Sequence, residues 1–159
     1  PGEIYVRNPV NITEYYKKPE KTEESWYDGF FTVGDVGYFD EDGYLYVVDR
    51  KRDMVISGGA NIYCAEVENV LHEHPKIWDV VVFGVPDEEW GERVHAAIQP
   101  VEGETLDEPE IADFVSERLA DYKKPRSIEI HEALPRDEAG KLRKRELREP
   151  HWAGHEKRI

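Results

Sequence analysis

Two polar residues of the sequence stand directly after glycines, where a side chain could reach a ligand. Asp35 follows Gly34 at the end of an apolar run, and its carboxylate could accept hydrogen bonds from vicinal hydroxyls such as those of a ribose. Lys141 follows Gly140 in a basic stretch, where its ammonium could offset negative charge that grows in a transition state. Each has a simpler interpretation, which these residues alone favour: Asp35 would cap its own turn, and Lys141 would belong to a solvated basic end.

Two further stretches could support movement and close approach. Residues 49–53 read Asp-Arg-Lys-Arg-Asp, and a charged stretch with few packing contacts suits either a hinge or a solvated linker. Gly58 and Gly59 allow positive φ, which would let another backbone or a ligand come close. The default interpretation of these glycines is a hairpin turn that leads into a helix, and the stretch lacks the Gly-x-x-x-x-Gly-Lys-Ser/Thr pattern of a phosphate-binding loop.

Other common arrangements of catalytic residues are not indicated. The six histidines are scattered: His72 and His74 are two apart on an expected helix and do not share a face, while His151 and His155 lie near the end without Cys or carboxylate neighbours. Cys64 is the only cysteine and has no obvious base, so we expect a buried or bystander thiol. The sequence therefore predicts neither a metal site nor a nucleophilic thiol.

Composition excludes several classes of protein. The chain has 159 residues, of which 39% are hydrophobic, enough for one sizeable core or two small ones. A formal net charge of −14 argues against nucleic acids and anionic membranes as partners. No apolar run is long enough for a transmembrane helix, and the single cysteine fits a cytoplasmic protein. Basic residues nevertheless gather at 50–52 and 123–148, which suits a small polyanion.

The hydrophobic pattern predicts two parts. Residues 1–49 are expected to be antiparallel β structure, the end of a sheet begun upstream, because Asp42-Gly43 stands between aromatic and β-branched runs. Within them, residues 8–28 are polar and expected to be irregular. The rest predicts, in order, a strand at 54–56, a helix at 63–74, strands at 78–85 and 93–101, a helix at 106–122, a strand at 127–131 and a short helix at 144–148.

The predicted fold class is therefore α+β: a short antiparallel β segment followed by a compact α+β lid domain. Residues 1–49 would be the end of a larger domain, residues 50–53 a hinge, and residues 54–159 a mobile C-terminal domain. The chain opens on Pro1-Gly2 without a Met, so we expect it to be a fragment.

The order and spacing of these stretches resemble one known family. Their blocks are similar to the late motifs of the acyl-adenylate-forming superfamily, to which the AMP-forming acyl-CoA synthetases or fatty-acid–CoA ligases belong. The blocks lie at residues 32–35, 42–45, 49–53, 57–68, 84–92, 122–125 and 135–141. The resemblance extends over essentially the whole sequence and implies the C-terminal portion of such an enzyme.

The resemblance implies a reaction in two halves. A carboxylate attacks ATP to give an acyl-adenylate and pyrophosphate, and the CoA thiol then displaces AMP to give the thioester, with the C-terminal domain rotating between the two. The implied roles, by position, are Asp35 for the ribose hydroxyls, Arg50 for the ribose or phosphate, Arg52 as the hinge residue, Gly58 and Gly59 for the CoA tunnel, and Lys141 as the catalytic lysine of adenylation.

The sequence departs from the family pattern in places. Arg52 stands where the family usually has Asp or Lys. Asp137 and Glu138 put two negative charges beside Lys141, which would weaken its pull on a carboxylate.

The resemblance also shows what the chain lacks. The family's phosphate loop, its Mg²⁺ ligand and its acyl pocket lie upstream, so the chain alone is expected to be inactive. The implied cofactors are ATP, CoA and Mg²⁺, and the implied partners are a carboxylic acid, with fatty acids as the best guess, and the upstream domain. A second interpretation stays open: a stand-alone module with the same fold that binds CoA, a nucleotide or a partner protein.

Overall fold

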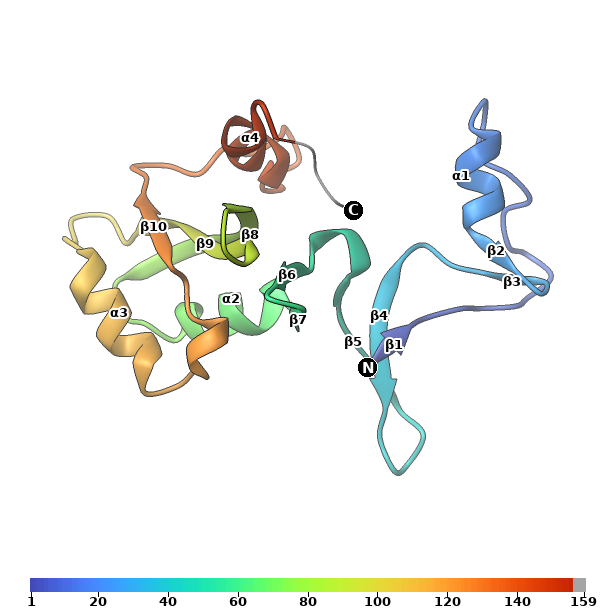
Figure 1. Cartoon of the computed structure of the whole chain (residues 1–159), viewed down its shortest axis with the longest axis horizontal. Helices are drawn as coiled ribbons and strands as arrows, with labels where there is room; N and C mark the ends of the chain where they lie inside the picture. The colour runs from blue at the N-terminus through green and yellow to red at the C-terminus, as the bar shows by residue number, and fades with distance from the viewer. Residues whose placement is uncertain (156–159) are drawn as a thin grey trace. The chain divides into compact units, whose positions relative to one another are not determined.

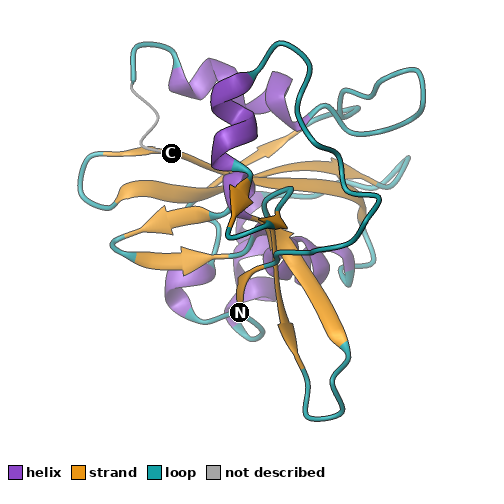
Figure 2. Cartoon of the chain, turned by 90° about the vertical axis from the view of Figure 1, so that its right-hand side faces the viewer, coloured by secondary structure: helices purple, strands orange, loops and turns teal. Residues whose placement is uncertain are grey.

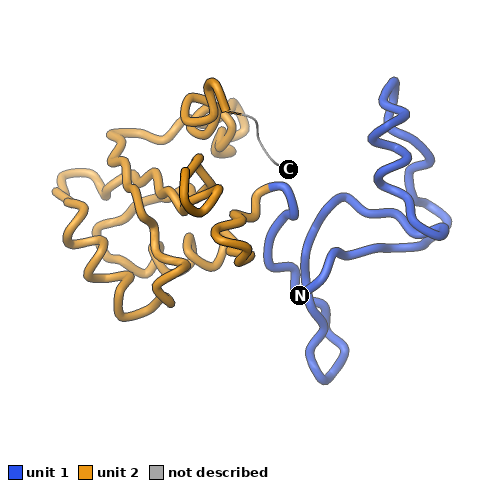
Figure 3. Tube along the Cα trace, viewed as in Figure 1, with its two compact units in different colours: residues 1–52 blue, residues 53–159 orange. Residues whose placement is uncertain are grey.

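The chain divides into two compact units. The structure, a computed structural model, describes residues 1–155. The first unit is Pro1–Arg52 and the second is Asp53–Ile159 (Figure 3). The boundary falls within the charged stretch at residues 49–53. Among residues 1–155, no helix has the length and apolar character needed to cross a membrane.

The first unit is built on a three-stranded antiparallel sheet in the order β1-β4-β5 (Figure 1). Its strands and those of an additional two-stranded ribbon are β1 (Gly2–Glu3), β4 (Asp35–Phe39), β5 (Leu45–Arg50), β2 (Trp26–Tyr27) and β3 (Phe30–Phe31). The hairpin predicted at Asp42-Gly43 is present between β4 and β5 (Figure 2). Gly43 has a φ of 84°, and Asp40 Oδ1 accepts the backbone N–H of Tyr44 at 2.8 Å.

The expectation that residues 8–28 are irregular was wrong, because α1 (Pro19–Glu24) lies within them. Proline at the first helical position is already in helical φ, and Glu20 in the first turn complements the positive end of the helix dipole. No residue of α1 is buried, so the helix shows none of the apolar periodicity that indicates a helix in a sequence.

The second unit combines a five-stranded sheet with three α-helices (Figure 1). The strands are β6 (Val55–Ser57), β7 (Ala60–Ile62), β8 (Ile77–Asp87), β9 (Gly91–Pro100) and β10 (Ser127–Ile130). The helices are α2 (Cys64–His72), α3 (Glu108–Ser116) and α4 (Lys144–Arg148), with 3₁₀ turns η2 (Asp121–Lys123) and η3 (Glu149–Trp152). A further 3₁₀ turn, η1 (Lys51–Asp53), spans the boundary between the two units in the sequence. β9 pairs antiparallel with β8 and parallel with β10. The α+β class predicted from the sequence is confirmed.

Two elements of the second unit differ from the prediction. β7 was missed because its Ala-Asn-Ile sequence lacks the apolar run Met-Val-Ile that indicated the equally short β6. The helix predicted at 106–122 ends at Ser116, since Ala120 has an extended backbone, with φ −61° and ψ 146°, before the turn η2. The apolar periodicity continued to Leu119 because that side chain is buried although it lies past the helix.

The core of the second unit covers both faces of β8. Alternate residues of a strand point to opposite sides, so Val80 and Val82 join one cluster while Val81, Phe83 and Val85 join another. Coverage of both faces explains the uninterrupted apolar run of this strand.

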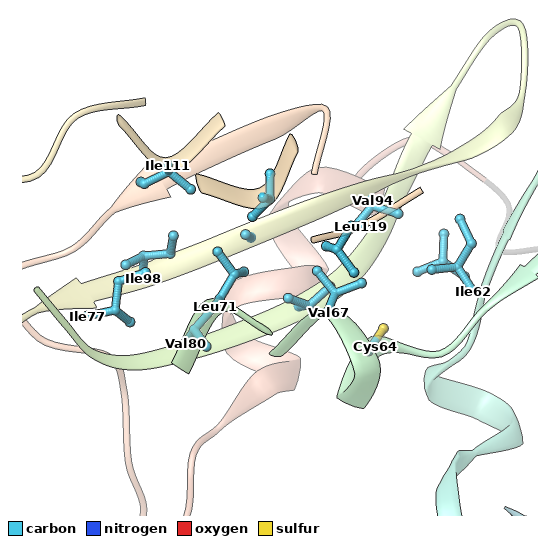
Figure 4. Packing of buried hydrophobic residues seen from close by; sticks show 14 residues of the cluster. Ile62, Cys64, Val67, Leu71, Ile77, Val80, Val94, Ile98, Ile111 and Leu119 are labelled. Carbon is cyan, nitrogen blue, oxygen red and sulfur yellow. The ribbon is translucent and has the colours of Figure 1, made fainter. Parts of the chain in front are cut away.

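The two clusters are closed by different parts of the chain. The first is packed by α2 and α3 and is shown in Figure 4, where Ile62, Cys64, Val67, Leu71, Ile77, Val80, Val94, Ile98, Ile111 and Leu119 are labelled. Cys64 is fully buried, as expected for a thiol without a catalytic role. The second cluster includes Leu134, and Leu142 and Leu147 pack against the cluster. The C-terminal stretch is therefore part of the core.

Replacing Gly84 with alanine is expected to destabilise the second unit by about 1–3 kcal/mol. A Cβ here would lie 2.3 Å from Glu92 Oε2 and 3.3 Å from Val55 Cγ1. Glu92 is buried, and its Oε2 accepts the backbone N–H of Ile56 at 3.3 Å, so displacing it costs both packing and a hydrogen bond. Denaturant unfolding followed by circular dichroism measures the effect. Gly2→Ala is the control, since its Cβ would meet nothing within 4 Å. Equal unfolding midpoints for the two variants would contradict the prediction.

Candidate functional site

In the first unit, Asp35 and Arg50 face each other across β4 and β5. They are register partners, and Arg50 Nε lies 3.6 Å from Asp35 Oδ1 with both side chains partly exposed. The turn before Asp35 is capped by Thr32, whose Oγ1 accepts the backbone N–H of Gly34 at 2.9 Å. Within residues 1–155 the Asp35 carboxylate accepts no backbone hydrogen bond, so the simpler interpretation, that Asp35 caps its own turn, was wrong. A carboxylate and a guanidinium are thus presented side by side.

In the sequence, Arg52 stands between Lys51, which contacts the first unit, and Asp53, which contacts the second. It is exposed and sits in the 3₁₀ turn η1. On one side, Lys51 Nζ binds Glu3 Oε2 at 2.8 Å, and this hydrogen bond raises the pKa of Lys51. On the other side, Arg148 Nη1 lies 3.9 Å from Asp53 Oδ1 within the second unit.

Gly58 and Gly59 form the tight turn between β6 and β7. Their φ angles are 57° and 83°, the combination that closes a two-residue hairpin with the right twist. The hairpin turn that the sequence predicted is thus present, and the helix α2 follows it after the short strand β7. The backbone N–H of Gly58 donates to the Trp90 carbonyl at 2.9 Å, and a Cβ on Gly58 would lie 2.5 Å from the Trp90 ring. Glycine is required here for two independent reasons.

Trp90 is held in place from two sides. Its backbone N–H donates to Asp87 Oδ1 at 2.9 Å, and this bond holds the pKa of the Asp87 carboxyl below its ordinary value. The guanidinium of Arg126 lies 5.7 Å from the ring centroid, within range of a cation–π contact. The indole that packs over Gly58 is thereby fixed.

A cleft of about 1210 Å³ opens beside this turn. Its walls come from the β6–β7 turn, the β8–β9 turn and the C-terminal segment, and include Gly59, Trp90, Arg93, His151 and Trp152. The indole Nε1 of Trp152 donates to the Gly84 carbonyl at 2.9 Å, which fixes the C-terminal wall on β8. Bare glycine backbone, an indole and a rim of charge suit a slender ligand with a polar end.

Lys141 stands on a short, anchored turn. Asp137 Oδ1 accepts the backbone N–H groups of Ala139 (3.0 Å) and Lys141 (2.9 Å), and Arg136 bonds the Gly140 carbonyl at 2.7 Å while its other nitrogen pairs with Asp79. The Lys141 side chain is exposed and, within the described part of the chain, forms no ion pair. The Asp137 carboxylate is thus engaged by the backbone of its own turn, and the turn presents a cation at its tip.

The structure groups the predicted residues in two sets. Asp35 and Arg50 form a pair in the first unit, while Gly58, Gly59 and Lys141 belong to the second. Gly59 lines the cleft, whereas Lys141 does not.

Sequence reasoning missed a group of histidines. His95, His131 and His151 gather around Glu129 although the three histidines lie at least 20 residues apart in the sequence. His95 is almost fully buried, and burial lowers its pKa to about 4, so its ring is neutral near pH 7.

Comparison with known proteins shows what the chain is similar to. Residues 66–141 match the family model of the AMP-binding enzyme C-terminal domain. The chain is 39% identical to the fatty acid–[acyl-carrier-protein] ligase ScoC of Streptomyces coeruleorubidus and 41% identical to the long-chain-fatty-acid–CoA ligase FadD13 of Mycobacterium tuberculosis. These matches cover 99% and 96% of the chain and 30% of each relative.

Solved structures give the same picture. The o-succinylbenzoate CoA synthetase of Bacillus subtilis, in complex with the acyl-adenylate intermediate OSB-AMP, matches with a TM-score of 0.82 and 40% identity. This match covers 92% of the chain and 30% of that protein. The chain therefore spans about 30% of the length of the proteins it matches.

Proposed function

Since the chain belongs to the acyl-adenylate-forming superfamily and corresponds to the C-terminal portion of its members, we propose that the whole protein is an AMP-forming acyl-CoA synthetase. Such an acid–thiol ligase joins a carboxylate to the α-phosphate of ATP and releases pyrophosphate. The thiol of CoA then attacks the acyl carbon, AMP leaves, and a thioester is formed. The proposal is supported chiefly by similarity to named ligases over at least 92% of the chain.

Asp35 and Arg50 are proposed to hold the nucleotide. A carboxylate accepts hydrogen bonds from both hydroxyls of a ribose, and a guanidinium binds a phosphate or the ribose oxygens. The partly exposed pair at the ends of β4 and β5 supports this role, because each group is within reach of the other and of a ligand.

Lys141 is proposed as the catalytic lysine of adenylation. Its ammonium would neutralise charge that develops as the carboxylate attacks the α-phosphate. The support is its exposed position on a turn held by Asp137 and Arg136, which places the charge without fixing the side chain.

Gly58 and Gly59 are proposed to line the CoA tunnel during thioester formation. The support is the cleft beside them and the absence of a side chain between the turn and Trp90. Arg52 is proposed as the hinge residue, with residues 1–49 belonging to the large domain and 54–159 moving as the C-terminal domain. The division of the chain after Arg52 supports this assignment.

A fatty acid is the proposed substrate, and the names of ScoC and FadD13 support it. ATP, CoA and Mg²⁺ are the proposed cofactors, with the Mg²⁺ ligand in the part of the protein upstream of this chain. A cytoplasmic location is also proposed, supported by the presence of a single cysteine, which rules out an internal disulfide.

The chain alone is proposed to be inactive, and ATP-dependent thioester formation tests this. The chain would be assayed by itself and mixed with the upstream part of the protein, using CoA or an acyl-carrier-protein thiol and a panel of fatty and aryl acids. Activity only in the mixture is the expected result. Activity of the isolated chain would refute its proposed inactivity. An inactive mixture with a folded upstream part, together with tight CoA binding by the chain alone, would favour a stand-alone binding module.

In the full-length enzyme, Asp35→Asn is expected to raise the KM for ATP about tenfold, because a hydrogen bond to a charged acceptor contributes about 1.5–3 kcal/mol. Initial rates at varied ATP measure the change. Asp42→Asn, at the exposed tip of the β4–β5 hairpin, is the matched control. A rise in the KM for the carboxylic acid instead of ATP would contradict the assignment.

A further inference from the structure

A polar cluster, in which His95 is buried and its neighbours are partly exposed, lies at the junction of β9, β10 and η3. Strand alternation puts Ser127 and Glu129 on one side of β10, and His131 follows the strand directly. β10 runs parallel to β9 with Ser127 opposite His95. The turn η3 then brings His151 over the same place, with its ring centroid 4.7 Å from that of His95. Three imidazoles therefore surround one carboxylate.

The donor atoms converge. From the Glu129 carboxylate oxygens, the Nε2 atoms of His131, His151 and His95 lie at 3.4, 3.7 and 4.0 Å. The ligand atoms of His95, Glu129 and His151 all lie within 4.8 Å of one another. Ligands of a tetrahedral Zn²⁺ stand about 3.4 Å apart, as Zn–N and Zn–O bonds near 2.1 Å require. Glu129 and His151 are partly exposed, so small rotations of their side chains would close the difference.

Two of these imidazole nitrogens are buried without a hydrogen-bond partner among the described residues. Within residues 1–155, His95 Nε2 and His131 Nε2 have no hydrogen-bond partner, since the approach of His131 to Glu129 lacks hydrogen-bond geometry. His95 is only 2% exposed, so leaving its Nε2 unpaired is costly. Its Nδ1 lies 2.8 Å from Ser127 Oγ. With the proton on Nδ1 donated to that hydroxyl, the Nε2 lone pair points to Glu129, as in the second shell of zinc-bound histidines.

From this convergence we propose that His95, Glu129 and His151 bind one divalent transition-metal ion of the zinc class. These side chains supply three ligands of a tetrahedral shell, and His131, whose Nε2 lies 3.4 Å from Glu129, is the neighbouring donor for the fourth position. The ion links β9 and β10 to η3. It thereby holds the C-terminal segment, whose His151 and Trp152 line the cleft, against the sheet. The sequence predicted no metal site, because these histidines lie far apart along the chain, and this proposal replaces that prediction.

Zinc binding by the intact chain tests the proposal. The protein, freed of any affinity tag and stripped with a chelator, is dialysed against ZnCl₂ and its metal content is measured. We expect one equivalent of zinc per chain, a melting temperature that rises with zinc, and Co²⁺ absorption bands typical of tetrahedral nitrogen and oxygen ligands. Absence of binding below millimolar zinc would overturn the proposal.

Variants separate this site from adventitious binding. His151→Ala and Glu129→Gln are each expected to weaken zinc binding at least tenfold, with circular dichroism confirming the fold. Glu129→Gln is isosteric at an exposed position and guards against misfolding. His72→Asn is the control, because His72 Nε2 also lies near a carboxylate, 3.6 Å from Asp79, but away from this group. Unchanged affinity in both site variants, or an equal loss in His72→Asn, would overturn the proposal.

Discussion

Lys141→Ala in the full-length enzyme is expected to slow acyl-adenylate formation about 10²–10³-fold, the cost of removing one preorganised charge-stabilising group. The substitution leaves the turn intact, since its hydrogen bonds to Asp137 and Gly140 come from the backbone and from Arg136. The release of pyrophosphate measures this half of the reaction. Thioester formation from a supplied acyl-adenylate should stay near the wild-type rate, because the lysine acts only while ATP reacts.

The lysine variant needs a control that removes a cation without touching the turn. Arg145→Ala serves, because Arg145 is exposed in α4 and pairs with Glu149 on the same helical face. It should leave both half-reactions unchanged. A Lys141→Ala enzyme that releases pyrophosphate at the wild-type rate, or that loses both halves equally, would show that the lysine is not the adenylation catalyst.

Gly58→Leu is expected to reduce thioester formation about 10²-fold while adenylation continues. Even the first carbon of the side chain would lie 2.5 Å from the Trp90 ring, and the φ of 57° is unfavourable for a residue with a Cβ. The turn and the indole must therefore separate, which changes the wall of the cleft. Single-turnover transfer from the acyl-adenylate to CoA measures the loss, with pyrophosphate release as the internal reference.

Gly103→Ala separates steric conflict from backbone strain. Gly103 also has positive φ, 84°, but a Cβ there would meet nothing within 4 Å, and the residue lies in the loop after β9. It should cost stability without a selective effect on either half-reaction. If Gly103→Ala lowered CoA transfer as much as Gly58→Leu, general destabilisation would explain both and the tunnel assignment would fail.

Elements with a strong local pattern were predictable from the sequence. The hairpin at Asp42-Gly43, the helix α2 and the strands β8 and β9 combine turn residues, apolar periodicity and sufficient length. α1 was not predictable, because a helix that buries nothing has no periodic pattern. The predicted helix extended past the end of α3 because Leu119, which lies beyond the helix, is buried. In a sequence, a buried leucine of a turn cannot be told from a buried leucine of a helix.

The candidate site likewise has a part that the sequence could predict and a part that it could not. Asp35, Gly58 and Lys141 stand in local motifs, so they could be singled out from the sequence. The contact of Gly58 with Trp90 could not, since it depends on the pairing of β6 with β9 at Ser57 and Gly91. The convergence of His95 and His151 needs the parallel pairing of β9 and β10 and the return of the C-terminal segment, neither of which local spacing encodes.

Coverage of β8 on both faces sets a limit on how far the chain can be shortened. Val81, Phe83 and Val85 are buried in one cluster with Leu134, and Leu142 and Leu147 pack against that cluster. The three leucines come from the last quarter of the sequence. A protein truncated before Leu134 would keep its sheet and the helices α2 and α3, yet present a row of large apolar side chains to water. Such an exposed patch promotes self-association, so this polar, basic end acts as the solubilising cover of an otherwise aggregation-prone sheet.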